Sequence, residues 1–394
     1  MKRMFSSALK VPILSWCSNI EPGALKQAVN LARLPFVFQH VGLMPDSHQG
    51  YGMSIGGVVG LKNTISPNMV GKDISCGMHA VKLDITAIDK EVLKKIMGRM
   101  RELIPVGFNH RTAVDDRYMP AHGAFDLAVC DAEYKSAKTQ IGTLGGGNHF
   151  QEIQMGSDGH IWFMLHSGSR NLGSRVADYY DSLAQEMNAK WHSVVPKGVD
   201  LAFLPVDSKE GQAYINEMTY CMDFARLNRQ FMADIIKEIF LLFTGAKPVE
   251  EYDVHHNFAA LEHHMGQNVW VHRKGATRAY EGEIGLIPGS QGTASYVVKG
   301  KGNVLSFKSC SHGAGRAMSR TKAQATLSLA DEIKRLDDQG ILHGIRGKSD
   351  LDEAAGAYKS IDEVMANQAD LVDVVVKLQP LAVIKDNTDK RRRK

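Results

Sequence analysis

The side chains best suited to chemistry are one acid, one cysteine and several histidines, most of them close to glycine. Asp73 and Cys76 are three residues apart, so both can turn toward one point. Histidines occur in comparable settings in the segments Thr143–Glu152, Leu165–Arg170 and Val254–Asn257. The candidate ligands are Asp73, Cys76, His149, His166 and His256. A set that mixes oxygen, sulfur and nitrogen suits Mn, Fe, Co or Zn better than Mg, which prefers oxygen ligands.

The spacing of the cysteines argues against a structural zinc site. The five cysteines are widely separated, and none forms the Cys–X2–Cys pair that is typical of such sites. We therefore expect a catalytic metal site that keeps positions open for substrate. Asp73 and Cys76 taken alone are explained about as well by a turn beside a buried cysteine, so the metal hypothesis depends on the whole set.

Phosphate binding would have to use loops other than the Walker type, because no G-x-x-x-x-G-K-[ST] loop is present. Pro288–Ser295 and His312–Arg316 can both present backbone N–H groups to phosphates. The triple glycine Gly145–Gly147 lets the backbone approach a ligand beside Asn148. Arg170 can bind a phosphate through two parallel hydrogen bonds. Each of these loops, taken alone, is also typical of an ordinary turn.

Two other segments that contain histidine receive no role from the sequence. The glycine-punctuated segment Pro45–Gly52 contains an acid and a histidine and resembles the ligand loops in composition. His263 and His264 form a pair in a stretch that we interpret as helical, without other ligand types nearby.

Hydrophobic periodicity predicts the elements that must position these loops. Helical spacing predicts helices over Ala24–Arg33, Asp89–Leu103, Arg175–Lys190 and about Gly211–Phe243. Apolar runs predict strands over Met53–Leu61, Ile161–His166, Asn268–His272 and Ala294–Lys299. Strict βαβ alternation is absent, so we expect a mixed α/β (α+β) fold in one domain, with mixed sheets flanked by helices. Glycine-flanked polar residues lie next to short strands at five places, which predicts strand ends converging on one central pocket.

Composition sets limits without selecting a function. The chain has 394 residues, of which 44% are hydrophobic and 23% charged, as in ordinary soluble proteins. Its net charge of +4 comes from the five basic residues 390–394, so any nucleic-acid site must be a local patch. That tail is either a phosphate-seeking arm or, more simply, a solvated end. Few and widely spaced cysteines favour a reducing cytoplasm, and no apolar run approaches the length of a membrane span.

Seven ordered segments resemble the RtcB family of RNA ligases. They read P-D-x-H-x-G-x-G, G-x-D-I-x-C-G-M, G-T-L-G-G-G-N-H-F-x-E, L-H-S-G-S-R, H-H-N, P-G-S-x-G and S-H-G-A-G-R-x-M-S-R-T-K-A, within about Pro35 to Lys385. Ser75 stands where the family pattern has glycine, and Gln291 where it has a hydrophobic residue, often methionine. The resemblance implies one catalytic domain over residues 1–385 around a metal and nucleotide pocket, followed by a basic tail over 386–394.

The resemblance also implies roles for the matched side chains. The ligand set would hold two Mn²⁺ ions with Cys76 as the bridge, and His312 would take GMP. Glu152 would recognise the guanine edge, and Lys385 would close the pocket. The implied guanine-nucleotide site comprises Asn148, His149, Phe150, Gln151, Glu152, His256, Asn257, Pro288, Gly289, Ser290, Gln291, Ser295, His312, Gly313, Ala314, Gly315 and Lys385. Arg170, Arg316 and Arg320 are candidates for contacts with RNA phosphates.

The reaction that the resemblance implies is GTP-dependent RNA ligation. It would join a 3′-phosphate or 2′,3′-cyclic phosphate end to a 5′-hydroxyl end through a histidine–GMP intermediate, in RNA repair or tRNA splicing. Two alternatives are a binuclear metallohydrolase, such as a phosphodiesterase, and a non-catalytic RNA-binding paralogue. Covalent labelling by GTP would separate them. We expect a cytoplasmic monomer whose partners are RNA and GTP, and the sequence leaves open the need for an archease-type activator.

Overall fold

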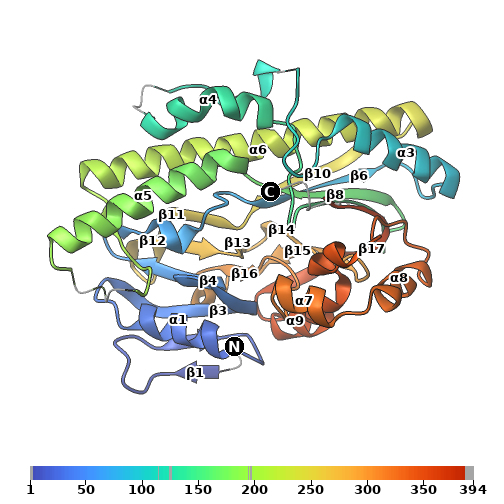
Figure 1. Ribbon diagram of the computed structural model, residues 1–394. Coiled ribbons are helices and arrows are strands. Elements are labelled where there is room, and N and C mark those ends of the chain that lie inside the picture. The colour runs from blue at the N-terminus through green and yellow to red at the C-terminus, as the bar shows by residue number, and fades with distance from the viewer. Residues whose placement is uncertain (1–2, 114, 124–126, 194, 196–197, 387–394) are drawn as a thin grey trace.

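Two large β-sheets carry the loops singled out above (Figure 1). The computed structural model of the chain describes residues 3–386 except 114, 124–126, 194 and 196–197. One sheet has the strand order β1-β2-β3-β4-β12-β11 and the other β10-β6-β8-β7-β17-β15-β14, and β13–β16 and β5–β9 form two small sheets. The strands are β1 (Arg3–Phe5), β2 (Ile13–Ser15), β3 (Val37–Tyr51), β4 (Met53–Leu61), β5 (Thr64–Ile65), β6 (Gly77–Leu83), β7 (Phe150–Gly156), β8 (Ile161–Ser167), β9 (Leu204–Pro205), β10 (Pro248–His255), β11 (Asn257–His264), β12 (Gln267–Lys274), β13 (Ala276–Arg278), β14 (Ile284–Ile287), β15 (Ser295–Gly300), β16 (Ser309–Ser311) and β17 (Val372–Ile384).

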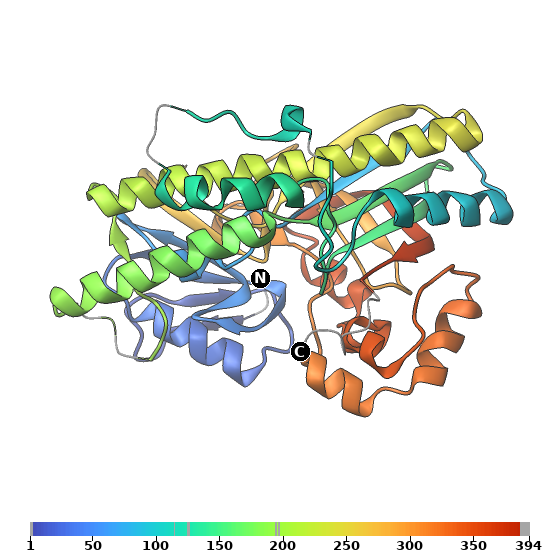
Figure 2. The same cartoon turned by 45° about the horizontal axis from the view of Figure 1, so that its top comes forward.

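Helices cover the sheets, and the longest of them, α6, packs against β6 and β8. Figure 2 shows α4 and α5 alongside α6, with α3 beside its other end. Ser208 begins α6 by accepting a hydrogen bond from the Gly211 amide, and Gly245 ends it in the left-handed conformation. The α-helices are α1 (Pro22–Ala32), α2 (Pro67–Val70), α3 (Lys90–Leu103), α4 (Ala128–Gln140), α5 (Arg170–Lys190), α6 (Lys209–Thr244), α7 (Arg320–Thr326), α8 (Leu329–Asp337) and α9 (Ile361–Asn367).

Four neighbouring strands of the second sheet bring most of the predicted metal ligands to one edge. The strands β10, β6, β8 and β7 are adjacent and mutually antiparallel, so each second strand begins where its neighbour ends. Cys76 and His149 immediately precede β6 and β7, His256 immediately follows β10, and His166 is the penultimate residue of β8. The convergence of strand ends that the sequence predicted is therefore present, and it results from antiparallel register.

The mixed α/β class and the predicted helices and strands are confirmed, with two differences. Helix α5 begins at Arg170 instead of Arg175, because Asn171, Gly173 and Ser174 hide the helical pattern of its first turn. His263 and His264 lie in strand β11, not in a helix; one is exposed and the other buried, as alternation along a strand requires.

In the described part of the chain, no helix has the length and apolar character needed to cross a bilayer. The division into a catalytic domain over residues 1–385 and a tail over 386–394 stays a prediction, because residues 387–394 lie outside the described ones.

Candidate active site

The five predicted metal ligands form one continuous cluster of donor atoms. Cys76 Sγ lies 3.1 Å from His166 Nε2 and 3.4 Å from His149 Nε2. His149 Nε2 is 3.0 Å from Asp73 Oδ2, and His166 Nε2 is 3.3 Å from His256 Nε2. Two triads share the cysteine: in Asp73–Cys76–His149 and in Cys76–His166–His256 all donor atoms lie within 4.8 Å of one another.

The surroundings of the cluster favour the charge states that metal ligands need at His166, His256 and Asp73, but not at Cys76. Burial lowers the pKa of His166 and His256 well below the ordinary range, so both imidazoles are neutral. Although burial alone would raise it, the hydrogen bond and charge of His149 hold the pKa of Asp73 well below its usual value. Burial, followed by the nearby Asp73 charge, raises the pKa of the Cys76 thiol, so the thiolate needs a cation beside it.

His149 has a defined tautomer. Its Nδ1 lies 2.9 Å from the Leu144 carbonyl oxygen, which can only accept, so Nδ1 carries the proton. Nε2 faces Asp73 and Cys76, and a bound metal ion would take the place of the proton between Nε2 and the Asp73 carboxylate. This is the usual arrangement of a metal-ligating histidine, whose second nitrogen donates to a carbonyl or carboxylate. The donor set thus fits a borderline divalent cation.

Two buried residues at the middle of α6 hold the ligand loops in place. The Asn228 amide oxygen accepts hydrogen bonds from the Gly142 and Thr143 amides at 2.8 and 3.1 Å, and its nitrogen donates to Ser167 Oγ and the Gly168 carbonyl. These groups flank His149 on one side and His166 on the other. Asn228 therefore connects two ligand loops through one side chain.

Arg229 similarly connects the loop that contains Cys76 with the end of β8. Its Nη1 donates to the carbonyl oxygens of Ser75 and Ser167 at 2.8 and 3.1 Å. Nε and Nη2 make two 2.6 Å bonds to the Asp253 carboxylate. The side chain is fully buried, so this planar guanidinium fixes Cys76 and His166 relative to β10.

Ser75 adopts a backbone conformation that explains why the family pattern has glycine at this position. Its φ is +56°, in the left-handed region, and its buried Oγ has no hydrogen-bond partner among the described residues. A side chain here strains the backbone, which glycine would not do.

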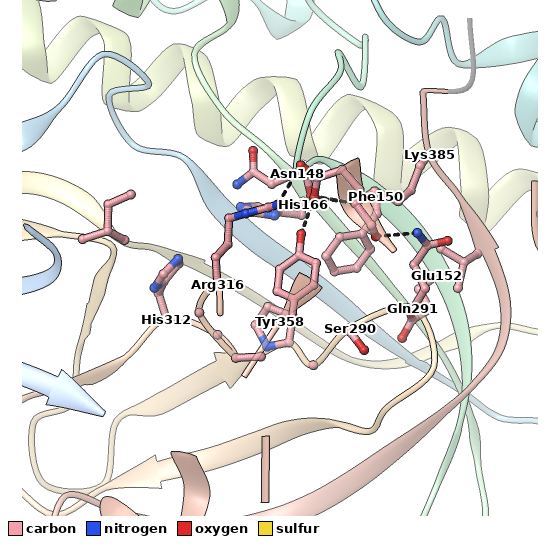
Figure 3. A pocket seen from close by; sticks show the side chains of 18 of the residues that line it. Asn148, Phe150, Glu152, His166, Ser290, Gln291, His312, Arg316, Tyr358 and Lys385 are labelled. Carbon is pink, nitrogen blue, oxygen red and sulfur yellow. Dashed lines mark hydrogen bonds and ion pairs between the residues drawn. The ribbon is translucent and has the colours of Figure 1, made fainter. Parts of the chain in front are cut away.

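Beside the metal ligands lies a pocket with a volume of about 260 Å³ (Figure 3). It contains most of the residues predicted for the nucleotide. The lining residues are His48, Ile55, Asn148, Phe150, Glu152, His166, Pro288, Gly289, Ser290, Gln291, His312, Gly313, Ala314, Gly315, Arg316, Arg320, Glu353, Tyr358, Val383 and Lys385. Figure 3 shows His312 on one side of the pocket and Glu152 and Lys385 on the other.

Some predicted nucleotide residues do not line this pocket. Gln151 lies between Phe150 and Glu152 on β7, so its side chain points to the opposite face. Asn257 instead joins two loops, donating to the Asp73 carbonyl and accepting from the Gly275 amide. Ser295 accepts from the Gly289 amide and supports the loop behind the pocket. His149 and His256 belong to the metal cluster.

Glu152 is a buried carboxyl group inside the pocket. Burial raises its pKa to about 8, although the hydrogen bond from Gln154 and the charge of Lys385 both act in the opposite direction. Gln154 Nε2 donates to Glu152 Oε1 at 2.5 Å from the same face of β7. The carboxyl group is therefore poised to change its protonation state near neutral pH, depending on what binds beside it.

His312 is oriented by a carboxylate that we did not assign from the sequence. Its Nδ1 lies 2.6 Å from Asp46 Oδ2, which also accepts from the His312 amide at 3.2 Å. The Nδ1 proton is thus directed at Asp46, and the Nε2 lone pair is free. Gly315 permits this approach: its φ is +70°, and a Cβ there would lie 2.3 Å from the Asp46 carbonyl oxygen. The ring centroids of His312 and His256 are 4.7 Å apart, so His312 adjoins the metal ligands.

A buried acid, Glu353, collects the cations of the pocket. Arg320 Nε and Arg316 Nη1 lie 2.8 and 3.2 Å from its Oε1, and Lys385 Nζ is 3.7 Å from Oε2. Tyr358 also donates its hydroxyl to this carboxylate. Burial opposes ionisation, but the surrounding cations lower the pKa of Glu353 to about 2. Arg316 and Arg320 are therefore already paired, whereas both were expected to contact RNA phosphates.

Sequence reasoning missed several of these residues. Asp46 and His48 lie in the segment Pro45–Gly52, whose composition resembles that of the ligand loops, so the sequence contained a signal for them; the structure places both residues in strand β3 instead of a turn. Glu353 and Tyr358, by contrast, come from an unremarkable segment of the sequence. Nothing in the sequence of α6 distinguished Asn228 and Arg229 from ordinary polar residues of a helix surface.

A mixed α/β scaffold thus places a thiol–imidazole–carboxylate cluster that could hold a metal ion next to a glycine-lined pocket. The chain matches the family model described as tRNA-splicing ligase RtcB over residues 27–386. It is 35% identical to the RNA-splicing ligase RtcB of Escherichia coli K12, over 95% of this chain and 97% of that protein. It is also 33% identical to the tRNA-splicing ligases RtcB of Nanoarchaeum equitans and Thermococcus kodakarensis, with at least 90% of each chain covered. This chain belongs to the RtcB family.

Proposed function

We propose that this protein joins RNA 3′-phosphate or 2′,3′-cyclic phosphate ends to 5′-hydroxyl ends, using GTP and Mn²⁺ and a covalent GMP adduct on His312. The observation that carries the proposal is the pairing of His312 with Asp46 at the junction of the pocket and the metal ligands. An imidazole whose Nδ1–H is bound to a carboxylate has a fixed ring and a free Nε2 lone pair, as a nucleophile requires.

The first step follows from this tautomer. His312 Nε2 attacks the α-phosphorus of GTP, a phosphorus–nitrogen bond forms, and the bond to the pyrophosphate oxygen breaks. The imidazole becomes positively charged as its lone pair is used, and the Asp46 carboxylate at 2.6 Å stabilises that charge. A 2′,3′-cyclic phosphate end is first opened by water to a 3′-phosphate. GMP passes to that 3′-phosphate as the phosphorus–nitrogen bond to His312 breaks, and attack by the 5′-hydroxyl then releases GMP and leaves a phosphodiester.

The opposite side of the pocket fits a guanine base. Glu152, when ionised, presents two acceptor oxygens, which match the N1–H and exocyclic N–H donors of guanine. Phe150 offers an aromatic face, with Lys385 Nζ 5.6 Å from its ring centroid. The loops Pro288–Gln291 and His312–Gly315 lie between, where phosphates would bind. The amides of Gly289, Ser290, His312 and Ala314 already donate within the protein, so phosphates would have to use the other backbone and side-chain donors of these loops.

Asp73, Cys76, His149, His166 and His256 would hold two Mn²⁺ ions, one in each triad, with Cys76 common to both. Such ions neutralise phosphate charge and activate the attacking oxygen. Arg170 lies at the Asp73 side of this cluster and is our leading candidate for an RNA phosphate. Arg316 and Arg320 would have to exchange Glu353 for phosphate oxygens. The cytoplasmic location, the monomeric state and an archease-type activator remain predictions.

A binuclear metallohydrolase is the second candidate, because it would use the same donors with water as the nucleophile. It leaves the His312–Asp46 pair and the buried Glu152 without a role. We therefore favour the ligase.

The test is incubation with α-labelled GTP and Mn²⁺. We expect label on the wild-type protein that is lost in acid and stable in alkali, as expected for a phosphorus–nitrogen bond to histidine. His312→Ala should bind metal but take no label, while His263→Ala, at an exposed histidine of β11, should label normally. His312→Ala should still seal RNA whose 3′-phosphate already carries GMP. An adduct that persists in His312→Ala would refute the assignment.

A further inference from the structure

Gln291 is a pocket residue whose chemistry departs from the family pattern, which has a hydrophobic residue at this position. Its side chain is only 8% exposed, and it lines the pocket around His312. Figure 3 shows Gln291 with Glu152 and Lys385, on the side of the pocket away from His312. The proposed function assigns the guanine base to that side. A buried amide there brings a donor and an acceptor, whereas a hydrocarbon side chain brings neither.

The orientation of the Gln291 amide is fixed by its one partner in the protein. Nε2 donates to the backbone carbonyl oxygen of Glu353 at 2.7 Å. Because a carbonyl oxygen can only accept, the nitrogen must face Glu353, and the amide cannot be turned the other way round. No N–H or O–H group of the described residues donates to Oε1. The side chain lines the pocket, and Oε1 is not buried without a partner, so it is an accessible acceptor.

The carboxylates on this side of the pocket leave one guanine proton without a partner. Glu353 Oε1 is occupied by Arg316 and Arg320, and its Oε2 by the Tyr358 hydroxyl. Glu152 would accept from N1–H and from the nearer proton of the exocyclic 2-amino group. The second proton of that amino group points away from N1, so the same carboxylate cannot reach it. An N–H group enclosed in a pocket without an acceptor loses its hydration uncompensated.

We infer that Gln291 Oε1 accepts this second proton of the guanine 2-amino group, which makes Gln291 a specificity-determining residue for GTP. The inference rests on the proposed function and deepens it, because it names the group that separates guanine from hypoxanthine, the same base without the 2-amino group. A methionine at this position would offer only a weak thioether acceptor. A site built to bond a polar group rejects the analogue that lacks it, so glutamine should increase selectivity against inosine nucleotides.

The test compares GMP with IMP, which differ only in the 2-amino group. Neither nucleotide has a pyrophosphate leaving group, so binding is measured without adduct formation. The Kd of each for the Mn²⁺-loaded protein is determined by equilibrium dialysis at pH 8.5, where Glu152 is mostly ionised. Gln291→Met should raise the Kd of GMP about two- to twelvefold, the range for losing one neutral hydrogen bond. The Kd of IMP should stay the same, because IMP has no proton for Gln291 to accept.

Gln212→Met is the matched control. Gln212 is exposed near the start of α6, and its Nε2 also donates to a backbone carbonyl, that of Val206 at 2.6 Å. This variant should keep the GMP and IMP affinities of the wild type. An equal rise of both Kd values in Gln291→Met would mean that Gln291 only supports the Glu353 backbone, and it would overturn the inference. An unchanged Kd of GMP in Gln291→Met would overturn it as well.

A modified ligand provides a test that needs no variant. N2-methyl-GMP keeps one 2-amino proton for Glu152 and has a methyl group in place of the other. The wild type should bind it more weakly than GMP, and equal binding would overturn the inference. Failure of the wild type to take label from GTP would instead refute the proposed function. A wild type that takes label, with the same ratio of GMP to IMP affinity in Gln291→Met, would overturn the role of Gln291 alone.

Discussion

The predicted metal-ligand cluster and the pocket around His312 adjoin each other but are held in different ways. Asn228 and Arg229, two adjacent residues of one helix, hold the metal-ligand loops through hydrogen bonds to their backbones. The pocket is organised around one buried carboxylate, Glu353, which gathers cations from separate segments of the chain. Side chains bonded to loop backbones hold the first region, and hydrogen-bonded ion pairs between side chains hold the second.

This difference suits what each region must do. Metal ligands have to keep their spacing to within a few tenths of an ångström, and buried hydrogen-bond networks provide such rigidity. Cations that meet a changing set of phosphates must be able to exchange partners. Pairing with the Glu353 carboxylate keeps Arg316 and Arg320 ordered, and under the proposed function phosphate oxygens would take the place of that carboxylate. Substitutions in the two regions should therefore have separable consequences.

The largest effect is expected from removing the shared ligand. Cys76→Ala takes one donor from both triads, so we expect loss of tightly bound Mn²⁺ and of GTP labelling together. Mg²⁺ alone should not support the wild type, because it fills a site with a sulfur ligand poorly. Metal content by elemental analysis and labelling by GTP are the measurements. Cys221→Ala, at another buried cysteine, is the control, and robust labelling of Cys76→Ala in Mg²⁺ would exclude Cys76 from the site.

The next largest effect tests whether Arg229 of α6 holds the metal-ligand loops in place. Arg229→Leu leaves Asp253 without its guanidinium and frees the Ser75 and Ser167 carbonyls, so the free energy of unfolding should fall by about 3–5 kcal/mol. Urea denaturation measures this, and the metal content of the folded fraction should fall with it. Arg226→Leu, an exposed arginine one turn earlier on α6, should change neither. A stable Arg229→Leu protein with full metal content would show that the metal-ligand loops keep their conformation without Arg229.

A smaller effect, confined to the pocket, concerns pH. With a pKa of about 8, Glu152 is mostly protonated at pH 7, and the acid then lacks the two acceptors that guanine needs. The affinity for GTP should rise with pH up to about 8 and level off above it, roughly eightfold between pH 7 and 8.5. Equilibrium dialysis with GTP measures this. Glu152→Gln should abolish the pH dependence of GTP affinity and reduce the preference for GTP over ATP, without changing the metal content. A pH dependence that persists in this variant would mean that another group recognises guanine.

The smallest expected effect concerns the backbone strain at Ser75, next to Cys76. Ser75→Gly should raise the free energy of unfolding by about 1 kcal/mol, because it relieves a left-handed φ and removes a buried hydroxyl without a partner. The measurement is again urea denaturation, with metal binding as the second readout. A decrease in stability would mean that the flexibility of glycine in the unfolded chain outweighs the strain.

Much of the site was accessible from the residues alone. Asp73, Cys76 and the three histidines were recognisable because metal ligands need particular atoms and glycine-rich turns to present them. The strand Met53–Leu61 and the helix α6 followed from hydrophobic periodicity, which reports burial directly. The family could also be predicted from the sequence, because seven motifs in the family's order require a scaffold that places them together.

What only the tertiary structure decided are the interactions between residues far apart in the chain. Asp46 meets His312 across 266 positions, and Trp16 meets Asp370 across 354. Periodicity and local composition carry no information about such pairs, because they depend on strand register and on which loops share an edge. The same holds for Glu353 and Arg229: a charged residue reads as solvent-exposed in sequence, and only packing shows it to be buried and satisfied.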